Sequence, residues 1–119
     1  LPWSPLTMGV LSGKYLNNQQ PGGTRFYHSE GSALRYGYRL TEEAEKATQS
    51  YVDIAKKHNL APSQMAISFT LAQPFVASTI IGATSVDQLK TNIGAIDVKL
   101  SDEVLEEIHS VYRQYPIPF

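Results

Sequence analysis

The sequence predicts an α/β fold that is rich in helix and contains about two strands of the parallel type. Between residues 41 and 112, apolar side chains recur mostly at three- and four-residue steps, which is typical of helices with one buried face. Two short apolar segments, at 1–6 and 76–81, have the composition of strands. Two strands do not make an independent parallel sheet, so we expect the helices to need a larger sheet than this chain supplies.

The composition indicates a single partial domain over residues 1–119. Apolar residues make up 42% of the chain and the formal net charge is −1, which excludes a disordered tail. The charges are scattered, so they indicate neither nucleic acid nor a membrane surface as a partner. There is no apolar run of spanning length and no secretion leader, so we expect a cytoplasmic location.

Cysteine is absent, which excludes disulfides, thiolate catalysis and thiolate metal sites. The three histidines, His28, His58 and His109, lie far apart in the sequence, and no spacing of His, Asp and Glu resembles a metal site. We therefore expect no metal, and we interpret each histidine as an ordinary surface or packing residue.

The first third of the chain is expected to be mostly loop. It opens abruptly on the apolar stretch 1–6, as though the chain began inside or just before a strand. A short helical turn is expected near 8–13, followed by a long loop rich in Gly, Asn, Gln, Ser and Tyr. With little to pack against, the part over 21–39 is expected to be disordered.

Four helices are expected after this loop. The first begins after Thr41 as N-cap and ends near Asn59, and the second begins at Pro62 and ends before Pro74. A capping box, Ser85-x-x-Gln88, opens the third, which should run to about residue 96. The last is capped by Ser101 and carries an apolar stripe formed by Val104, Leu105, Ile108, Val111 and Tyr112.

Two segments carry features of an anion site. In the first, over 3–15, backbone N–H groups after a strand could hold a phosphate and Lys14 could add charge; the alternative is a strand end, a turn and an exposed lysine. In the second, over 81–92, a glycine after a buried strand leads into a helix N-terminus. Gln88 and Asn92 share one face of that helix, where they either reach a ligand or merely cap the helix and meet water.

Together these segments resemble a known family. The pattern Trp-Ser-Pro-Leu-x-x-Gly-x-Leu-x-Gly-Lys-Tyr at 3–15, and Ile-Ile-Gly-Ala-Thr-Ser-x-x-Gln-Leu-x-x-Asn-Ile-Gly-Ala at 80–95, is similar to the aldo-keto reductases, especially the branch with the potassium-channel β subunits. The resemblance covers essentially the whole chain. It implies the C-terminal portion of a TIM-type (α/β)₈ barrel, an incomplete barrel because complete ones take about 250 residues.

The resemblance also implies an NADP(H) site at the carboxyl ends of the barrel strands. The first matched positions would line the pyrophosphate and nicotinamide, the loop cations would bracket phosphates, and the positions after the last strand would meet the adenosine end with its 2′-phosphate. In chain order, these positions are Trp3, Ser4, Pro5, Leu6, Gly9, Lys14, Arg25, Gly82, Thr84, Gln88, Thr91 and Asn92.

Catalysis is not expected from this chain alone. Members of the family reduce aldehydes and ketones with an Asp, a Tyr, a Lys and a His that come from earlier strands, and none of the tyrosines here matches the catalytic one. The leading hypothesis is therefore a segment of an NADPH-dependent oxidoreductase. The alternatives are a stand-alone nucleotide-binding or self-associating module, and an inert remnant. Self-association or pairing with a complementary barrel half is expected to cover the apolar faces.

Overall fold

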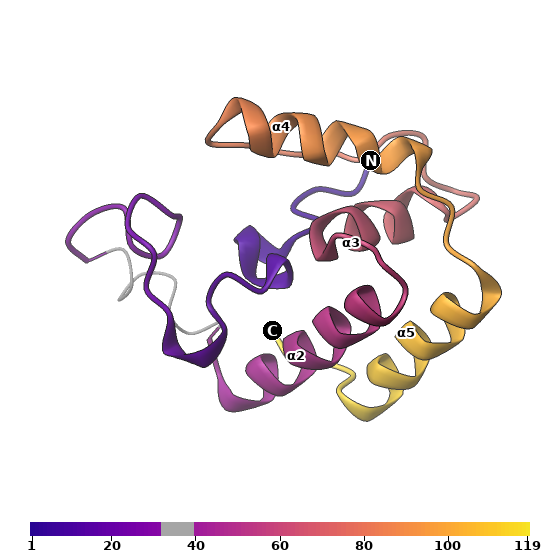
Figure 1. The fold of residues 1–119 in the computed structure, drawn as a ribbon, viewed down its shortest axis with the longest axis horizontal. Coiled ribbons are helices and arrows are strands. Elements are labelled where there is room, and N and C mark those ends of the chain that lie inside the picture. Colours follow the sequence, from indigo (N-terminus) through magenta and orange to yellow (C-terminus); the bar gives the residue numbers. More distant parts are fainter. Residues whose placement is uncertain (32–39) are drawn as a thin grey trace.

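The computed structural model describes residues 1–31 and 40–119, and the regular elements of this part of the chain are all helices. In chain order the elements are the 3₁₀ helices η1 (Thr7–Ser12) and η2 (Leu16–Asn18), then α2 (Glu42–Lys57), α3 (Pro62–Leu71), α4 (Val86–Ile93), η4 (Gly94–Asp97) and α5 (Asp102–Gln114). Helix α3 lies between α2 and α4, and α5 packs beside α2 (Figure 1). Of the helices described, none has the length and apolar content that crossing a membrane requires.

The ends of α2 confirm the prediction from sequence. The Thr41 hydroxyl accepts a hydrogen bond from the Ala44 N–H at 3.1 Å and so caps the first turn. At the other end, Asn59 adopts a left-handed conformation with φ of 55°. The Leu60 N–H donates to the Ala55 carbonyl at 2.8 Å, and the Asn59 N–H donates to the Lys56 carbonyl, which together form a Schellman motif. The helix therefore stops where the asparagine predicts.

Two apolar clusters hold the helices together. The larger joins α2, α3 and α5 through Ile54, Ala55, Met65, Val104, Ile108 and Val111. The smaller joins η1 to the loop that follows it, through Val10, Tyr15 and Phe26. Helix α4 contributes to neither cluster, and it is attached through polar contacts such as the hydrogen bond from the Gln64 side chain to the Thr91 carbonyl at 2.9 Å.

Over 21–31, one residue of the long loop is buried in the interior, contrary to expectation. Phe26 has no exposed surface, and its ring meets that of Tyr15 edge to face at 4.7 Å between centroids. One fully buried aromatic side chain anchors this stretch at Phe26, which the expectation of disorder over 21–39 did not foresee. The remainder of that prediction, at 32–39, falls outside the described residues.

The prediction for the third helix was right at its start and wrong at its end. The Ser85 hydroxyl accepts from the Gln88 N–H at 3.2 Å, as the capping box requires. The α-helix ends at Ile93, however, and the chain continues as η4 from Gly94 to Asp97. The fourth helix begins after Ser101, whose hydroxyl accepts from the Val104 N–H at 3.2 Å, as predicted.

The two predicted strands do not form. Trp3 and Ile80 make an isolated parallel bridge, in which the Ile80 N–H donates to the Pro2 carbonyl at 2.8 Å. Trp3 and Ile80 are 79% and 53% exposed, whereas we expected 76–81 to be buried on both faces. A strand in a parallel sheet gains stability from neighbouring strands on both sides. Among the described residues, each of these two segments pairs only with the other segment. The two segments therefore pair in the parallel direction that we expected, but the described residues form no β-sheet.

Candidate functional site

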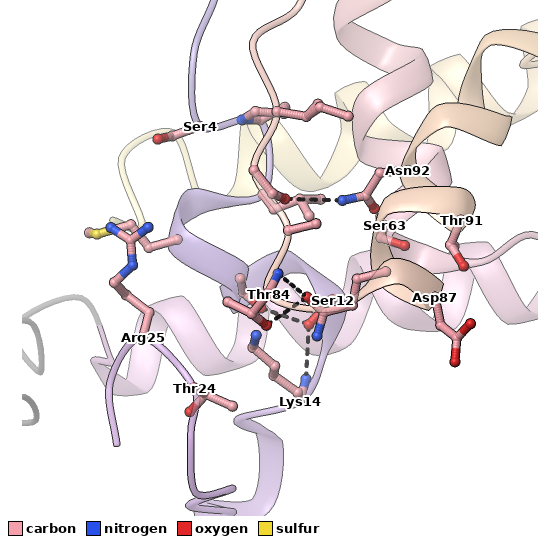
Figure 2. Close-up of a pocket in the computed structure, with 18 of the residues that line it drawn as sticks. Ser4, Ser12, Lys14, Thr24, Arg25, Ser63, Thr84, Asp87, Thr91 and Asn92 are labelled. Carbon is pink, nitrogen blue, oxygen red and sulfur yellow. Dashed lines mark hydrogen bonds between the residues drawn. The ribbon is translucent and has the colours of Figure 1, made fainter. Parts of the chain in front are cut away.

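A cavity of about 700 Å³ opens at the carboxyl side of the Trp3–Ile80 bridge. Its walls begin with the residues that directly follow each bridged segment, Ser4 on one side and Ile81 on the other. Helix α4, η1 and the loop at 23–28 complete the walls (Figure 2). The volume falls within the range of about 300–1,000 Å³ that is usual for small-molecule sites.

The cavity brings together nearly all of the positions predicted from sequence. Eleven of the twelve line it, although they come from three separate stretches of the chain: Ser4, Pro5, Leu6, Gly9, Lys14, Arg25, Gly82, Thr84, Gln88, Thr91 and Asn92. Trp3 is the exception, because its backbone forms the bridge below the cavity and its side chain is largely exposed. The expectation that Trp3 lines the site is therefore not met in this structure.

The backbone over 4–9 is unusual. Ser4, Thr7 and Met8 all have positive φ, of 54°, 48° and 56°, and Gly9 has a φ of 96°. For residues with a Cβ this conformation costs about 1–2 kcal/mol each. Such strain concentrates at ligand sites, where the surroundings enforce it.

The turn at 4–9 also uses its own N–H groups. The N–H of Thr7 donates to the Ser4 carbonyl and the N–H of Gly9 donates to the Leu6 carbonyl, each at 2.9 Å. These two groups are therefore not free to act as phosphate donors, and for them the alternative of a simple turn holds.

Lys14 is folded back over this turn. A Cβ on Gly9 would lie 2.7 Å from Lys14 Cε and 2.8 Å from Lys14 Nζ, so a larger residue at position 9 would push the lysine away. The Lys14 ammonium also lies 5.3 Å from the centre of the Tyr15 ring, a cation–π distance. Glycine at position 9 thus serves two needs, the positive φ and the close approach of the lysine.

The lining favours an anion. Lys14 and Arg25 are the cationic side chains among the described lining residues, and Asp87 is the carboxylate. Arg25 lies on the side of the cavity away from Asp87 and Thr91 (Figure 2). The N-terminus of α4 adds the partial positive charge of its dipole, since the lining includes Thr84, Asp87 and Gln88 from its start.

The loop that enters α4 is tied to the helix by side chains. The Gln88 Oε1 atom accepts from both the N–H and the hydroxyl of Thr84 at 3.0 Å. In a capping box this oxygen would meet the N–H of Ser85, so the reciprocal bond has shifted by one residue. The Asn92 side chain is buried and donates to the Gly82 carbonyl at 3.3 Å. The two amide side chains therefore hold the shape of 82–84 as well as lining the cavity.

Sequence reasoning missed other lining residues. They are Met8, Ser12, Gly23, Thr24, His28, Ser63, Ile81, Ala83 and Asp87. Most are neighbours of predicted positions, and Asp87 lies in the first turn of a helix that was predicted. Ser63 carries no such signal, because only the packing of α3 against η1 and α4 brings it to the cavity.

Comparison with known proteins identifies the family. The family model described as "Aldo/keto reductase family" matches residues 1–113. The chain belongs to the aldo/keto reductase family. The motifs at 3–15 and 80–95 predicted this, and the prediction is confirmed.

The curated relatives include the potassium-channel β-subunit branch that the motifs suggested. The "Protein tas" of Escherichia coli (strain K12) is 47% identical over 118 residues, which are 99% of this chain and 33% of that protein. The "Putative voltage-gated potassium channel subunit beta" of Schizosaccharomyces pombe is 33% identical over 97% of this chain and 34% of its own length. The "Uncharacterized oxidoreductase YrpG" of Bacillus subtilis is 30% identical over 92% of this chain and 31% of its own length. The chain thus spans about a third of the length of each of these aldo/keto reductase relatives.

Proposed function

We propose that this chain is an NADP(H)-binding segment of an aldo/keto reductase, corresponding to the C-terminal portion of a TIM-type barrel. The observation that supports this most strongly is the cavity, which collects eleven of the twelve positions that the family resemblance assigns to the cofactor. Its place at the carboxyl side of a parallel strand pairing fits the location of ligands in barrels of this type.

The residues present fit a dinucleotide with three phosphate groups. Lys14 and Arg25 supply two positive charges on the η1 and loop walls, where they would meet the phosphates. The start of α4, with Thr84 and Gln88, would meet the adenosine end, and Thr91 and Asn92 would lie around the 2′-phosphate and adenine. The open space around Gly82, where a Cβ would meet no atom within 4 Å, leaves room for close approach of a ligand.

In the complete enzyme we propose that bound NADPH supplies a hydride for reduction of an aldehyde or ketone. The family resemblance places the Asp, Tyr, Lys and His of the proton-donating site on strands that have no counterpart in this chain. The 119-residue chain is therefore proposed to bind the cofactor without catalysing reduction by itself.

The first experiment is a calorimetric titration of the purified chain with NADPH, and with NADH as the control. We expect saturable binding of one NADPH per chain, and weaker binding of NADH, because NADH lacks the 2′-phosphate, one of the three phosphate groups that the lining would hold. Absence of heat with NADPH would contradict the proposal and favour an inert remnant. Equal affinity for both nucleotides would contradict the assignment of a 2′-phosphate site.

A specific observation also supports self-association or pairing with a complementary barrel half. Helix α4 carries Val86, Leu89 and Ile93 on one face, at spacings of three and four residues, and they are 66%, 41% and 57% exposed. Trp3 and Ile80, which form the bridge, are also exposed, and so is Phe75. Where several large apolar side chains on one helix face are exposed, as on α4, an interaction site is the usual reason.

We therefore expect the isolated chain to form dimers or larger assemblies, measured by size-exclusion chromatography with light scattering. Replacing Ile93 by glutamate should shift the population to monomer, because it places a charge on the exposed face. The matched control is Lys90→Glu, which places the same charge at another exposed position of α4. A wild-type chain that stays monomeric at high concentration would overturn the expectation.

A further inference from the structure

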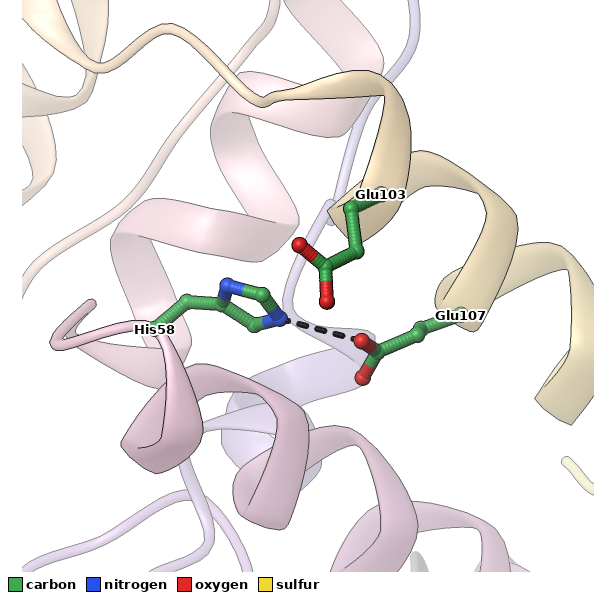
Figure 3. A group of neighbouring side chains, drawn as sticks. All are labelled: His58, Glu103 and Glu107. Atoms are coloured by element: carbon green, nitrogen blue, oxygen red, sulfur yellow. Dashed lines mark hydrogen bonds and ion pairs between the residues drawn. The ribbon is translucent and has the colours of Figure 1, made fainter.

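A second polar cluster lies away from the cavity, where the end of α2 meets α5. His58 at the C-cap of α2 faces Glu103 and Glu107 on α5 (Figure 3). One ligand atom from each side chain lies within 4.8 Å of the others. The sequence gives no sign of this arrangement, because the histidine and the glutamates come from different helices and only the packing of those helices brings them together.

The cluster is held by rigid elements. His58 is fixed by the Schellman turn that ends α2, and its N–H donates to the Ile54 carbonyl at 3.1 Å. Glu103 and Glu107 are one helical turn apart, so both side chains project from the same face of α5. The two helices share the larger apolar cluster, which includes Ile54 and Ile108. Ligands on packed helices keep their positions better than ligands on loops.

The spacing suits a small divalent ion. His58 Nε2 and Glu107 Oε1 are 3.1 Å apart. Tetrahedral Zn²⁺ with ligands at about 2.0–2.2 Å separates neighbouring donor atoms by roughly 3.4 Å. Glu103 is mostly exposed, so its long side chain can turn inward to complete three protein ligands. A water molecule would take the fourth position.

A cationic side chain, that of Lys57, already contacts the two carboxylates of the cluster. The Lys57 ammonium lies 2.6 Å from Glu107 Oε1 and 3.5 Å from Glu103 Oε1, bridging the two carboxylates. The hydrogen bonds from Lys57 and then from His58 hold the pKa of Glu107 below its usual value, so this carboxylate is ionised at neutral pH. Lys57 is itself largely exposed, and exposed ion pairs contribute little stability, so its flexible side chain can leave for solvent.

We propose that His58, Glu103 and Glu107 form a Zn²⁺ site that links the C-terminal end of α2 to α5, with Lys57 as the competing cation. A mixed set of one imidazole and two carboxylates favours Zn²⁺ over Mg²⁺, which requires an octahedron of oxygen atoms. This site is separate from the proposed NADP(H) cavity, since none of its residues lines that cavity.

The test is calorimetric titration of the 119-residue chain with ZnCl₂, with MgCl₂ as the comparison. We expect one Zn²⁺ per chain, with affinity reduced about tenfold or more in His58→Ala and Glu107→Gln. Lys57→Ala should bind Zn²⁺ about two- to threefold more tightly, because it leaves the two carboxylates without a counter-charge. The control is His109→Ala, which removes a histidine of α5 outside the cluster and should leave the affinity unchanged.

A spectroscopic measurement on the unmodified chain keeps the proposal testable if a variant fails to fold. Adding Zn²⁺ should shift the imidazole proton resonances of His58 and leave those of His28 and His109 in place. Failure to detect Zn²⁺ binding would overturn the proposal. So would binding that survives His58→Ala at full strength, which would show an adventitious ion on other groups.

Discussion

Replacing Lys14 and Arg25 together by alanine is expected to weaken NADPH binding by about a hundredfold and NADH binding by clearly less. A hydrogen bond from a cationic side chain to an anion is worth roughly 1.5–3 kcal/mol, which corresponds to about tenfold or more for each side chain. Both side chains line the cavity and are its described cations. The difference between the nucleotides is expected because the 2′-phosphate, which only NADPH carries, adds negative charge to the ligand that the two cations attract.

The measurement is again calorimetric, with far-UV circular dichroism to confirm that the double variant keeps its helices. Lys90→Ala is the matched control, because Lys90 is an exposed lysine of α4 that does not line the cavity. It should bind both nucleotides as the wild type does. Equal losses for NADPH and NADH in the double variant would argue that the cations meet the pyrophosphate alone. Unchanged binding would remove both residues from the site.

Replacing Phe26 by alanine is expected to lower the free energy of unfolding by about 3–5 kcal/mol, which is the usual cost of removing a buried phenylalanine ring. Phe26 is fully buried and packs against Val10 and Tyr15. The substitution should also weaken NADPH binding, because Arg25 is its neighbour and depends on the same packed loop. Urea denaturation followed by circular dichroism gives the stability.

Phe75→Ala is the matched control, since Phe75 is 81% exposed and its removal should change the free energy of unfolding by no more than about 0.5 kcal/mol. If Phe26→Ala does not fold, Phe26→Leu provides the measurement, with an expected loss of about 1–1.5 kcal/mol. Equal urea midpoints for Phe26→Ala and Phe75→Ala would show that the loop over 21–31 is not packed in solution.

The helices could be predicted because their signals are local. Thr41, Ser101 and Asn59 each act through hydrogen bonds or backbone conformation within a few residues, and each one limits a helix in the structure. The strand prediction failed because a strand depends on partners far along the chain. The stretch 76–81 has the β-branched composition of a buried strand, but among the described residues its backbone pairing is with the segment around Trp3.

Part of the cavity lining was predictable from the sequence, and its detailed hydrogen bonding was not. Motif resemblance identified positions that the fold gathers around one cavity, from Ser4 to Asn92. It did not reveal that the N–H groups of Thr7 and Gly9 are used within the turn, because this depends on the positive φ values there. Ser63 and the His58 cluster were out of reach for the same reason: contacts between helices have no local pattern in the sequence.

The exposed position of Trp3 also determines what the intrinsic fluorescence of this protein reports. Trp3 is the only tryptophan in the chain, and it lies on the bridge at the edge of the proposed cofactor cavity, 79% exposed. Its indole belongs to neither apolar cluster, so we expect its emission wavelength to report little on the packing of the helical core. Its emission instead reports the solvation of this edge, so a fluorescence spectrum of the native chain can detect a partner that covers the two bridged segments.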